Sequence, residues 1–477
     1  METFSDYSVW GTINLIAVLL LSLLAANIIK KTVPLLRVSL IPTSVLGGAI
    51  LLIISLIYSA VTDKYIFNTG FFGGNGQNVL EIITYHMLAL GFIATSFKPV
   101  KKKLTKRRTK EIFDTGVTTV STYLLQGVLG MGITILFALG AFAVAKYAGI
   151  LLPFGYGQGT GQALNWGGVY EADYGFIGGK SFGLTIAAFG FISASIGGVI
   201  HLNILRKKGH TTVHEEDEAE ALVSEGIQEA DEIPMSGSMD KMSVQIAFVF
   251  AAYVVSYGIM YLLAKFFPGL TSVIYGFNFL FGVLVATLFC VVINHLRRAK
   301  IVRKQYINSF LMDRIGGFCF DIMVIAGVAA IRIEALKSYW LVLLTLGLAG
   351  AFVTYFYLRF VARKLFSRYS EEQFLMMYGM LTGTACTGII LLREKDPEFK
   401  TPASDNLVYQ NVPAMVFGFP LMLIANLAPQ HPYITIGILA GFFLVLNIIL
   451  FRPYIFGVRR RRKKRLAEEQ AQKMENK

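Results

Sequence analysis

Long apolar stretches alternate with short polar loops along the whole chain. A helix needs about 20 mostly apolar residues to cross a bilayer, and eleven stretches reach or approach that length. They cover residues 9–29, 41–61, 79–97, 117–142, 182–205, 242–267, 273–296, 310–331, 340–360, 411–427 and 434–450. The pattern predicts an all-α polytopic membrane protein.

Two stretches interrupt this pattern at membrane depth. Residues 154–170 read FGYGQGTGQALNWGGVY and residues 378–388 read YGMLTGTACTG, each between apolar segments. Non-helical backbone survives at that depth only when it is buried in protein or lines a wet cavity. We therefore expect two re-entrant hairpins, at about 143–170 and at about 374–392, with a binding site at their tips.

The charge of the loops predicts the topology. Lysine and arginine concentrate in the loops after the odd-numbered spans, and such loops are cytoplasmic. The N-terminus is then outside and the C-terminus is cytoplasmic. Because the first half has an odd number of spans, the second half enters the membrane from the other side, as in transporters built from inverted repeats.

This order divides the chain into four parts. Residues 1–208 form a first inverted repeat of five spans and one hairpin, and residues 241–428 form a second. Residues 209–240 between them are acidic and too polar to bury a core, which predicts a cytoplasmic linker. Residues 429–477 add one further span and a basic cytoplasmic tail.

The composition agrees with this class. Hydrophobic residues make up 55% of the 477 residues and charged residues 16%, whereas soluble proteins average about 25% charged. The net charge of +14 comes from short basic runs between spans, so nucleic-acid binding is not expected. The cysteines Cys290, Cys319 and Cys386 lie in apolar stretches, which indicates neither a disulfide framework nor a metal cluster. The first 30 residues lack the features of a cleaved signal peptide, so we expect the first helix to stay in the membrane.

The two tips carry groups suited to a small charged solute. Helix ends leave backbone N–H and C=O groups unpaired; N-terminal ends favour carboxylates, and carbonyl ends favour cations. Glycine lets a ligand approach the backbone closely. The alternative is that the small residues only allow helices to pack closely. The predicted substrate-binding residues are Gly157, Gln158, Gly159, Thr160, Gly161, Thr382, Gly383, Thr384 and Thr387.

Few ionisable groups lie within the spans. Asp321 lies about midway along residues 310–331, where it could hold a cation or pair with a neighbouring helix. Asn165 and Asn426 are polar at similar depth and complete the predicted cation-binding set, although Asn426 could equally join two helices. The spans contain no paired carboxylates or metal-ligand set, so no catalytic residues, no metal site and no enzymatic activity are predicted.

Several motifs resemble the sodium/glutamate symporters of bacteria. GQGTG at residues 157–161 is similar to that family's GHGTG motif, with Gln158 in place of histidine, and IPTSVLGG at residues 41–48 is similar to its IP-x-x-V-x-GG. Glu171 and the YGF of residues 174–176 resemble its E-x-YGF stretch with one residue added. In the fourth apolar stretch, the spacing found in that family is matched by Gln126, Gly130 and Gly132. The second half matches less closely: Gly379, Gly383 and Thr387 resemble the second hairpin, while Cys386 replaces an expected proline.

The resemblance implies a homodimer in the bacterial inner membrane, built from two inverted five-helix repeats with two re-entrant hairpins. It also implies uptake of glutamate or a related acidic amino acid with Na⁺ as coupling ion, by movement of a transport domain against a scaffold. A sodium- or proton-coupled carrier of a different organic anion is the closest alternative. An ion channel is a weaker one, because known re-entrant filters repeat one loop fourfold.

Overall fold

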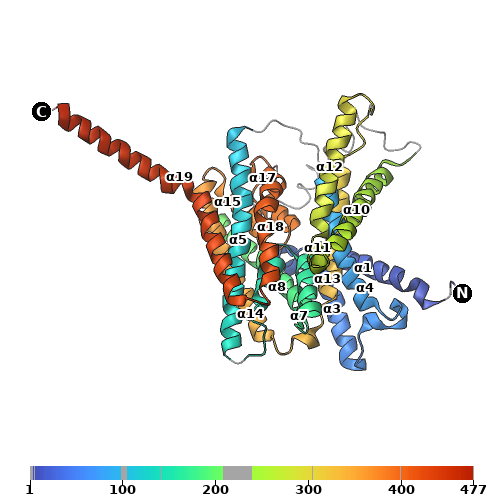
Figure 1. Ribbon diagram of the computed structural model, residues 1–477. Coiled ribbons are helices and arrows are strands. Elements are labelled where there is room, and N and C mark those ends of the chain that lie inside the picture. Colours follow the sequence, from blue (N-terminus) through green and yellow to red (C-terminus); the bar gives the residue numbers. More distant parts are fainter. Residues whose placement is uncertain are drawn as a thin grey trace.

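The computed structural model describes residues 4, 6–97, 105–140, 142–207, 239–302, 304–397 and 399–475. Within these ranges every regular element is a helix (Figure 1), so the predicted all-α fold is confirmed. The long helices are α1 (Tyr7–Thr32), α3 (Thr43–Thr62), α4 (Gly76–Ser96), α5 (Lys106–Leu139), α8 (Gly179–Lys207), α10 (Lys241–Phe266), α12 (Asn278–Arg298), α13 (Ser309–Ala329), α14 (Trp340–Leu365), α18 (Asn411–Leu427) and α19 (Pro432–Glu475). The short ones are α2 (Pro34–Val38), α6 (Leu151–Tyr156), α7 (Thr160–Tyr174), α11 (Thr271–Gly276), α15 (Ser370–Thr382), α16 (Ala385–Arg393) and α17 (Ala403–Tyr409).

Each of the eleven apolar stretches contains one long helix. Nine helices of the described ranges are apolar and long enough to cross a membrane, and α17 with α18, bent by 50°, make a tenth candidate. The remaining predicted span is α13, which has 21 residues but carries Asp313, Arg314 and Asp321. Asp313 and Arg314 are exposed near the start of α13, and Asp321 is half-buried midway along it.

Two predicted boundaries are wrong. The stretch 273–296 breaks at Phe277 into α11 and α12, where the Asn278 side chain accepts a hydrogen bond from the Phe279 backbone N–H at 2.6 Å. Such local bonds compete with the helical pattern. The second wrong boundary is the start of α5, which lies at Lys106 instead of residue 117. Its polar first turns are stabilised by the Thr105 cap and by Glu111, which pairs with two arginines.

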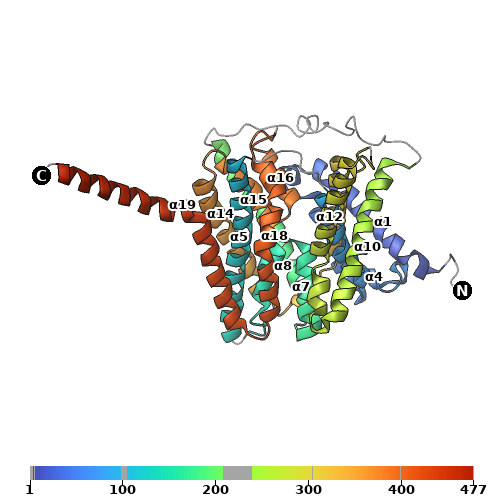
Figure 2. The same ribbon diagram turned by 45° about the horizontal axis from the view of Figure 1, so that its top comes forward.

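The helices gather into two groups, visible side by side in Figures 1 and 2. The wall bundle contains α1, α3, α4, α10, α12 and α13. The hairpin bundle contains α5 to α8 and α14 to α19. The groups meet mainly where α7 and the start of α8 pack against α4 and α13. Each bundle therefore combines elements from both halves of the chain.

Within the bundles, the two halves make matching contacts. In the wall bundle α3 packs on α13 while α12 packs on α4, and α4 and α13 pack on each other. In the hairpin bundle α8 packs on α14 while α18 packs on α5, and α5 packs on α14. Each pair has its counterpart with the two halves exchanged.

The last helix, α19, is attached to the hairpin bundle. Leu439, Leu446 and Leu450 are buried, and the Asn447 amide donates to Ser121 Oγ of α5 at 2.8 Å. The helix continues to Glu475, so the predicted extra span and tail form one helix. The predicted linker lies almost wholly outside the described residues, which resume at Met239.

One end of the molecule is marked by basic helix ends. Arg206, Arg297 and Arg363 lie in the last turns of α8, α12 and α14. We call this end the basic side and the other end the opposite side. Residues 154–170 come after α5, which ends on the opposite side. Residues 378–388 come after α14, which ends on the basic side.

Candidate functional site

The first interruption forms a helical hairpin. α6 ends at Tyr156, residues 157–159 make the turn, and α7 starts at Thr160. Gly159 has φ +82°, a left-handed conformation that side-chain-bearing residues rarely adopt, which explains the glycine. The second arm extends to Tyr174, beyond the predicted end near 170, and Gly175 closes it with φ +67°. We call this element hairpin 1.

The second interruption forms hairpin 2, from α15 and α16. Gly383 and Thr384 make the turn, and Thr384 caps α16 by accepting from the Thr387 N–H at 3.4 Å. The two arms pack closely because glycines face each other: a Cβ on Gly379 would lie only 2.7 Å from the Gly388 Cα.

The two tips are in contact with each other. A Cβ placed on Gly159 would lie 3.7 Å from the Gly383 carbonyl oxygen and 3.7 Å from Thr384 Cγ2. The two tips, from segments more than 200 residues apart in the chain, thus lie next to each other. Of the predicted residues, the structure brings together Gly157, Gln158, Gly159 and Thr160 with Thr382, Gly383, Thr384 and Thr387.

Helix α5 holds both tips in place. The Tyr123 hydroxyl donates to the Gly157 carbonyl at 3.2 Å. One turn further, the Gln126 amide donates to the Leu381 carbonyl of hairpin 2 at 3.0 Å and to Thr354 Oγ1 of α14 at 2.9 Å. The sequence marks Gln126 as polar at depth, but nothing in it connects this residue to the second hairpin.

Two glycines on neighbouring helices complete the support. Gly190 of α8 leaves room for the Thr382 carbonyl and for Tyr156, whose Cα would lie 3.3 Å from an added Cβ. Gly327 of α13 faces Thr160, whose Cβ would lie 2.9 Å from an added Cβ. α8 therefore touches both tips, and α13 brings the wall bundle to hairpin 1.

The tips differ in the polar groups that remain available. In hairpin 2, Thr382 Oγ1 donates to the Tyr378 carbonyl at 2.6 Å, and Thr384 and Thr387 bond each other at 3.3 Å. In hairpin 1, Thr160 is fully buried and its hydroxyl has no hydrogen-bond partner. Both polar atoms of the Gln162 side chain are also buried without a partner. Unpaired buried groups are uncommon and call for an explanation.

The other predicted residues have separate positions. A Cβ added to Gly161 would lie 2.8 Å from Leu88 Cδ1, so the glycine allows α7 to approach α4. Asn165 donates to the Gly276 carbonyl at 3.2 Å and ties α7 to α11. Asn426 follows Ala425, whose carbonyl accepts from Tyr170 at 2.8 Å. Tyr170 is ten residues beyond Thr160, about 15 Å along the helix, so Asn426 is not at the tips.

Asp321 of α13 is half-buried. It lies beside the Ser44 hydroxyl of α3, and it is within electrostatic range of the Cys386 thiol at the start of α16. Cys386 exposes its side chain, whereas Cys290 and Cys319 are buried. The carboxylate therefore lies near the tip of hairpin 2.

An ion cluster closes the contact between the bundles on the opposite side. Glu81 of α4 accepts from Lys180 Nζ of α8 at 2.7 Å and from Arg332 at 2.7 Å. The Arg332 N–H donates to Ser181 Oγ at 3.0 Å, and Glu171 Oε2 accepts from the Lys180 N–H at 3.1 Å. Glu81 is nearly buried, so its charge is compensated by two cations.

A second cluster holds the start of hairpin 2 on the basic side. Glu371 of α15 pairs with Arg359 of α14 and with His201 Nε2 of α8 at 2.9 Å. His201 Nδ1 in turn bonds the Tyr355 hydroxyl at 2.8 Å. Hairpin 2 is thereby bound to α8 and α14 of its own bundle.

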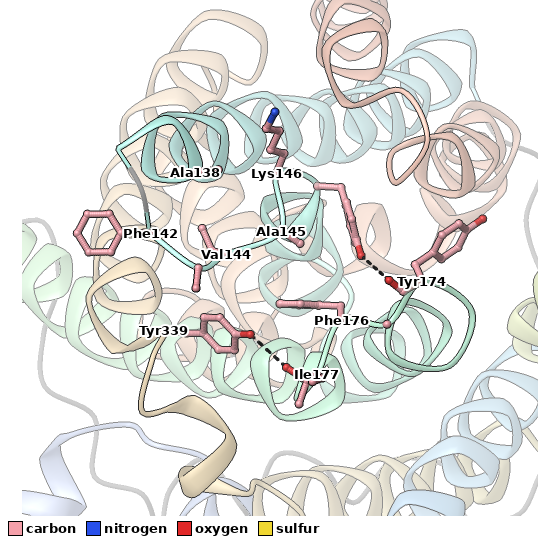
Figure 3. Close-up of a pocket in the computed structure, with 12 residues that line it drawn as sticks. Ala138, Phe142, Val144, Ala145, Lys146, Tyr174, Phe176, Ile177 and Tyr339 are labelled. Atoms are coloured by element: carbon pink, nitrogen blue, oxygen red, sulfur yellow. Dashed lines mark hydrogen bonds between the residues drawn. The ribbon is translucent and has the colours of Figure 1, made fainter.

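A surface hollow of about 520 Å³ lies at the far end of hairpin 1 (Figure 3). Aromatic rings and Lys146 line it, and the hydroxyls of Tyr147 and Tyr339 donate to the carbonyls of Tyr174 and Ile177, both at 3.4 Å. Tyr174 is 14 residues from Thr160, about 21 Å along α7. This hollow is therefore separate from the tips.

Comparison with known proteins agrees with the residue motifs. Among the described residues, no group of three or more His, Cys, Asp or Glu could hold a metal ion. A search of curated proteins found no match. The sodium/glutamate symporter family model matches residues 9–377, which is most of the chain and includes hairpin 1. The chain thus belongs to the sodium/glutamate symporter family.

Proposed function

We propose that this transporter carries glutamate or a related acidic amino acid together with Na⁺ across the bacterial inner membrane by alternating access. The observation that carries the proposal is the close approach of Gly159 to Gly383 and Thr384, beside the unpartnered Thr160 and Gln162. Two tips that enter from opposite sides would bind one solute between them. The site would comprise the residues predicted for both tips.

The backbone at the tips suits an anion and a cation together. Gly159 precedes α7 and provides no side-chain cap, so the first N–H groups of the helix are available to a carboxylate. α15 ends at Thr382, and its last carbonyls favour a cation. Asp321, which is within electrostatic range of Cys386 at the start of α16, supplies negative charge for Na⁺ or for a substrate amine.

The two bundles are the bodies that would move. The Glu81–Lys180 contact holds them together on the opposite side, while Cys386 is exposed within range of Asp321. This combination supports a site closed on one side and open toward the basic side. The exchanged contacts of the two halves support inverted repeats of residues 1–208 and 241–428. With the basic side cytoplasmic, the N-terminus is outside, and we expect a homodimer.

Uptake by purified protein tests this function. Proteoliposomes loaded without Na⁺ should accumulate labelled L-glutamate against its gradient when Na⁺ is applied outside. Uptake that saturates and concentrates the solute separates a carrier from a channel. A carrier of another organic anion would show Na⁺- or proton-driven uptake of that anion, with L-glutamate inactive as a competitor. Absence of any coupled uptake would contradict the proposal.

A further inference from the structure

Two buried polar side chains on α7 form a candidate subsite beyond the tip. Gln162 and Trp166 are 1% and 2% exposed. The Gln162 amide nitrogen and oxygen and the Trp166 indole nitrogen have no hydrogen-bond partner. Residues four apart lie on the same face of a helix, so the two side chains leave α7 on one face.

Other polar side chains of α7 either have partners or face elsewhere. Asn165 and Tyr170, the neighbouring polar side chains of the same helix, donate to backbone carbonyls at 3.2 and 2.8 Å. Thr160 lies about 200° round the helix from Gln162 and faces Gly327 of α13 instead. The Gln162 and Trp166 groups therefore belong to a different side of α7.

The indole is held rigidly. The Trp166 ring stacks on Phe154 of α6, with centroids 5.2 Å apart and an interplanar angle of 19°. It also contacts the Tyr170 ring at 5.8 Å. An indole N–H is only a donor, and these contacts restrict its direction. A pre-positioned donor is what binding of a carboxylate oxygen requires.

We propose that Gln162 and Trp166 bind the side-chain carboxylate of the transported acidic amino acid, while its amino and α-carboxyl groups stay at the tips. This inference rests on the proposed function. Gln162 Nε2 and Trp166 Nε1 donate to the carboxylate oxygens, and they determine selection of glutamate over glutamine. Gln162 is three residues from Gly159, about 4.5 Å along the axis, so one extended substrate reaches from tip to subsite. The tips must open to admit it.

Tryptophan fluorescence tests binding directly. The chain has three tryptophans, and Trp10 and Trp340 are 50% and 64% exposed. The double variant Trp10→Phe and Trp340→Phe leaves Trp166 as the only reporter. Titration with L-glutamate in Na⁺ should give a saturable change in emission, with glutarate also effective and L-glutamine ineffective. Unchanged emission while L-glutamate uptake saturates would overturn the subsite and leave the transport function intact.

Uptake kinetics separate recognition from structure. Trp166→Phe keeps the ring stack and removes the N–H, so the KM for L-glutamate should rise about tenfold with Vmax retained. Gln162→Glu adds a negative charge and should shift preference toward L-glutamine. Trp340→Phe is the matched control with unchanged KM. If Trp166→Phe lowers the melting temperature but leaves KM unchanged, the two groups bind only internal water and the inference is wrong. Loss of uptake by the unmodified chain would instead contradict the proposed function.

Discussion

Lys180 of α8 donates to Glu81 of α4 across the boundary between the two bundles, with 2.7 Å between Nζ and Oε2. Arg332 occupies the other oxygen of the same carboxylate at 2.7 Å. Glu81 is nearly buried, whereas the Lys180 and Arg332 side chains are about one-third exposed. The carboxylate is therefore the member whose loss leaves the most charge uncompensated.

This asymmetry predicts different effects for the two partners. Glu81→Gln should lower the free energy of unfolding by about 1–3 kcal/mol, because two cations lose their partner in a partly buried site. Lys180→Met should cost less than about 1 kcal/mol, since Arg332 still pairs with Glu81. Thermal unfolding in detergent measures both, with Lys64→Met as a surface control. Equal losses for the two variants would contradict this account.

The thiol of Cys386 reports which side the tip of hairpin 2 faces. It is exposed, and the other two cysteines are buried, so the unmodified chain carries one accessible thiol. A membrane-impermeant maleimide should label inside-out vesicles and leave right-side-out vesicles unlabelled. Na⁺ with L-glutamate should slow the labelling. Cys386→Ser is the control. Labelling from the outer face alone would show that the tip of hairpin 2 is not accessible from the basic side.

Gly159 should tolerate no side chain. Its φ of +82° makes even alanine unfavourable by about 1–2 kcal/mol, and valine adds bulk against Gly383 and Thr384. We expect uptake to fall several-fold for Gly159→Ala and at least about tenfold for Gly159→Val. Gly258 has open space around its Cα, so Gly258→Ala is the matched control. Normal uptake by Gly159→Val would exclude this turn from the transport site.

Gln126 connects α5 to the last turn of α15. Gln126→Leu leaves the Leu381 carbonyl and Thr354 without their donor, which should cost about 1–3 kcal/mol of stability. It should also raise the KM for substrate, because the tip of hairpin 2 is no longer fixed. Tyr123→Phe removes the longer bond to Gly157 and should have the smaller effect. Thermal unfolding and uptake kinetics should be measured for both variants. A larger effect of Tyr123→Phe than of Gln126→Leu would contradict the role of Gln126 in fixing hairpin 2.

The loops on the opposite side contain a pH-sensitive contact. The hydrogen bond from the Tyr65 hydroxyl holds the pKa of Glu334 below its usual value, and burial together with this carboxylate raises the pKa of Tyr65 to about 12. Because the Glu334 pKa is lowered on folding, its stabilisation is present above the ordinary carboxyl pKa near 4.5 and is lost as the pH falls through the folded value. The melting temperature of the unmodified chain should exceed that of Glu334→Gln at neutral pH. The difference between the two melting temperatures should shrink as the pH drops. A constant difference would argue against the contact.

The positions of the helices follow from the sequence because membrane burial demands length and apolarity locally. All eleven apolar stretches contain a long helix, and the two interruptions appear as helical hairpins. Glycine and threonine content also identifies Gly159 and Thr384 as turn residues, since backbone conformation is a local property. The break at Phe277 escapes this reasoning because an asparagine side chain, not apolarity, decides it.

Only the tertiary structure decides which polar groups remain free. Thr382 and Thr387 resemble Thr160 in the sequence, yet their hydroxyls have partners and that of Thr160 has none. Gln162 and Trp166 carry no motif that distinguishes them from packing residues, and Asn426 lies away from the tips. The sequence by itself determined the helices, the hairpins and the family, because these depend on local pattern. The meeting of the tips and the unpaired atoms beside them depend on contacts between distant segments, which only the folded chain brings together.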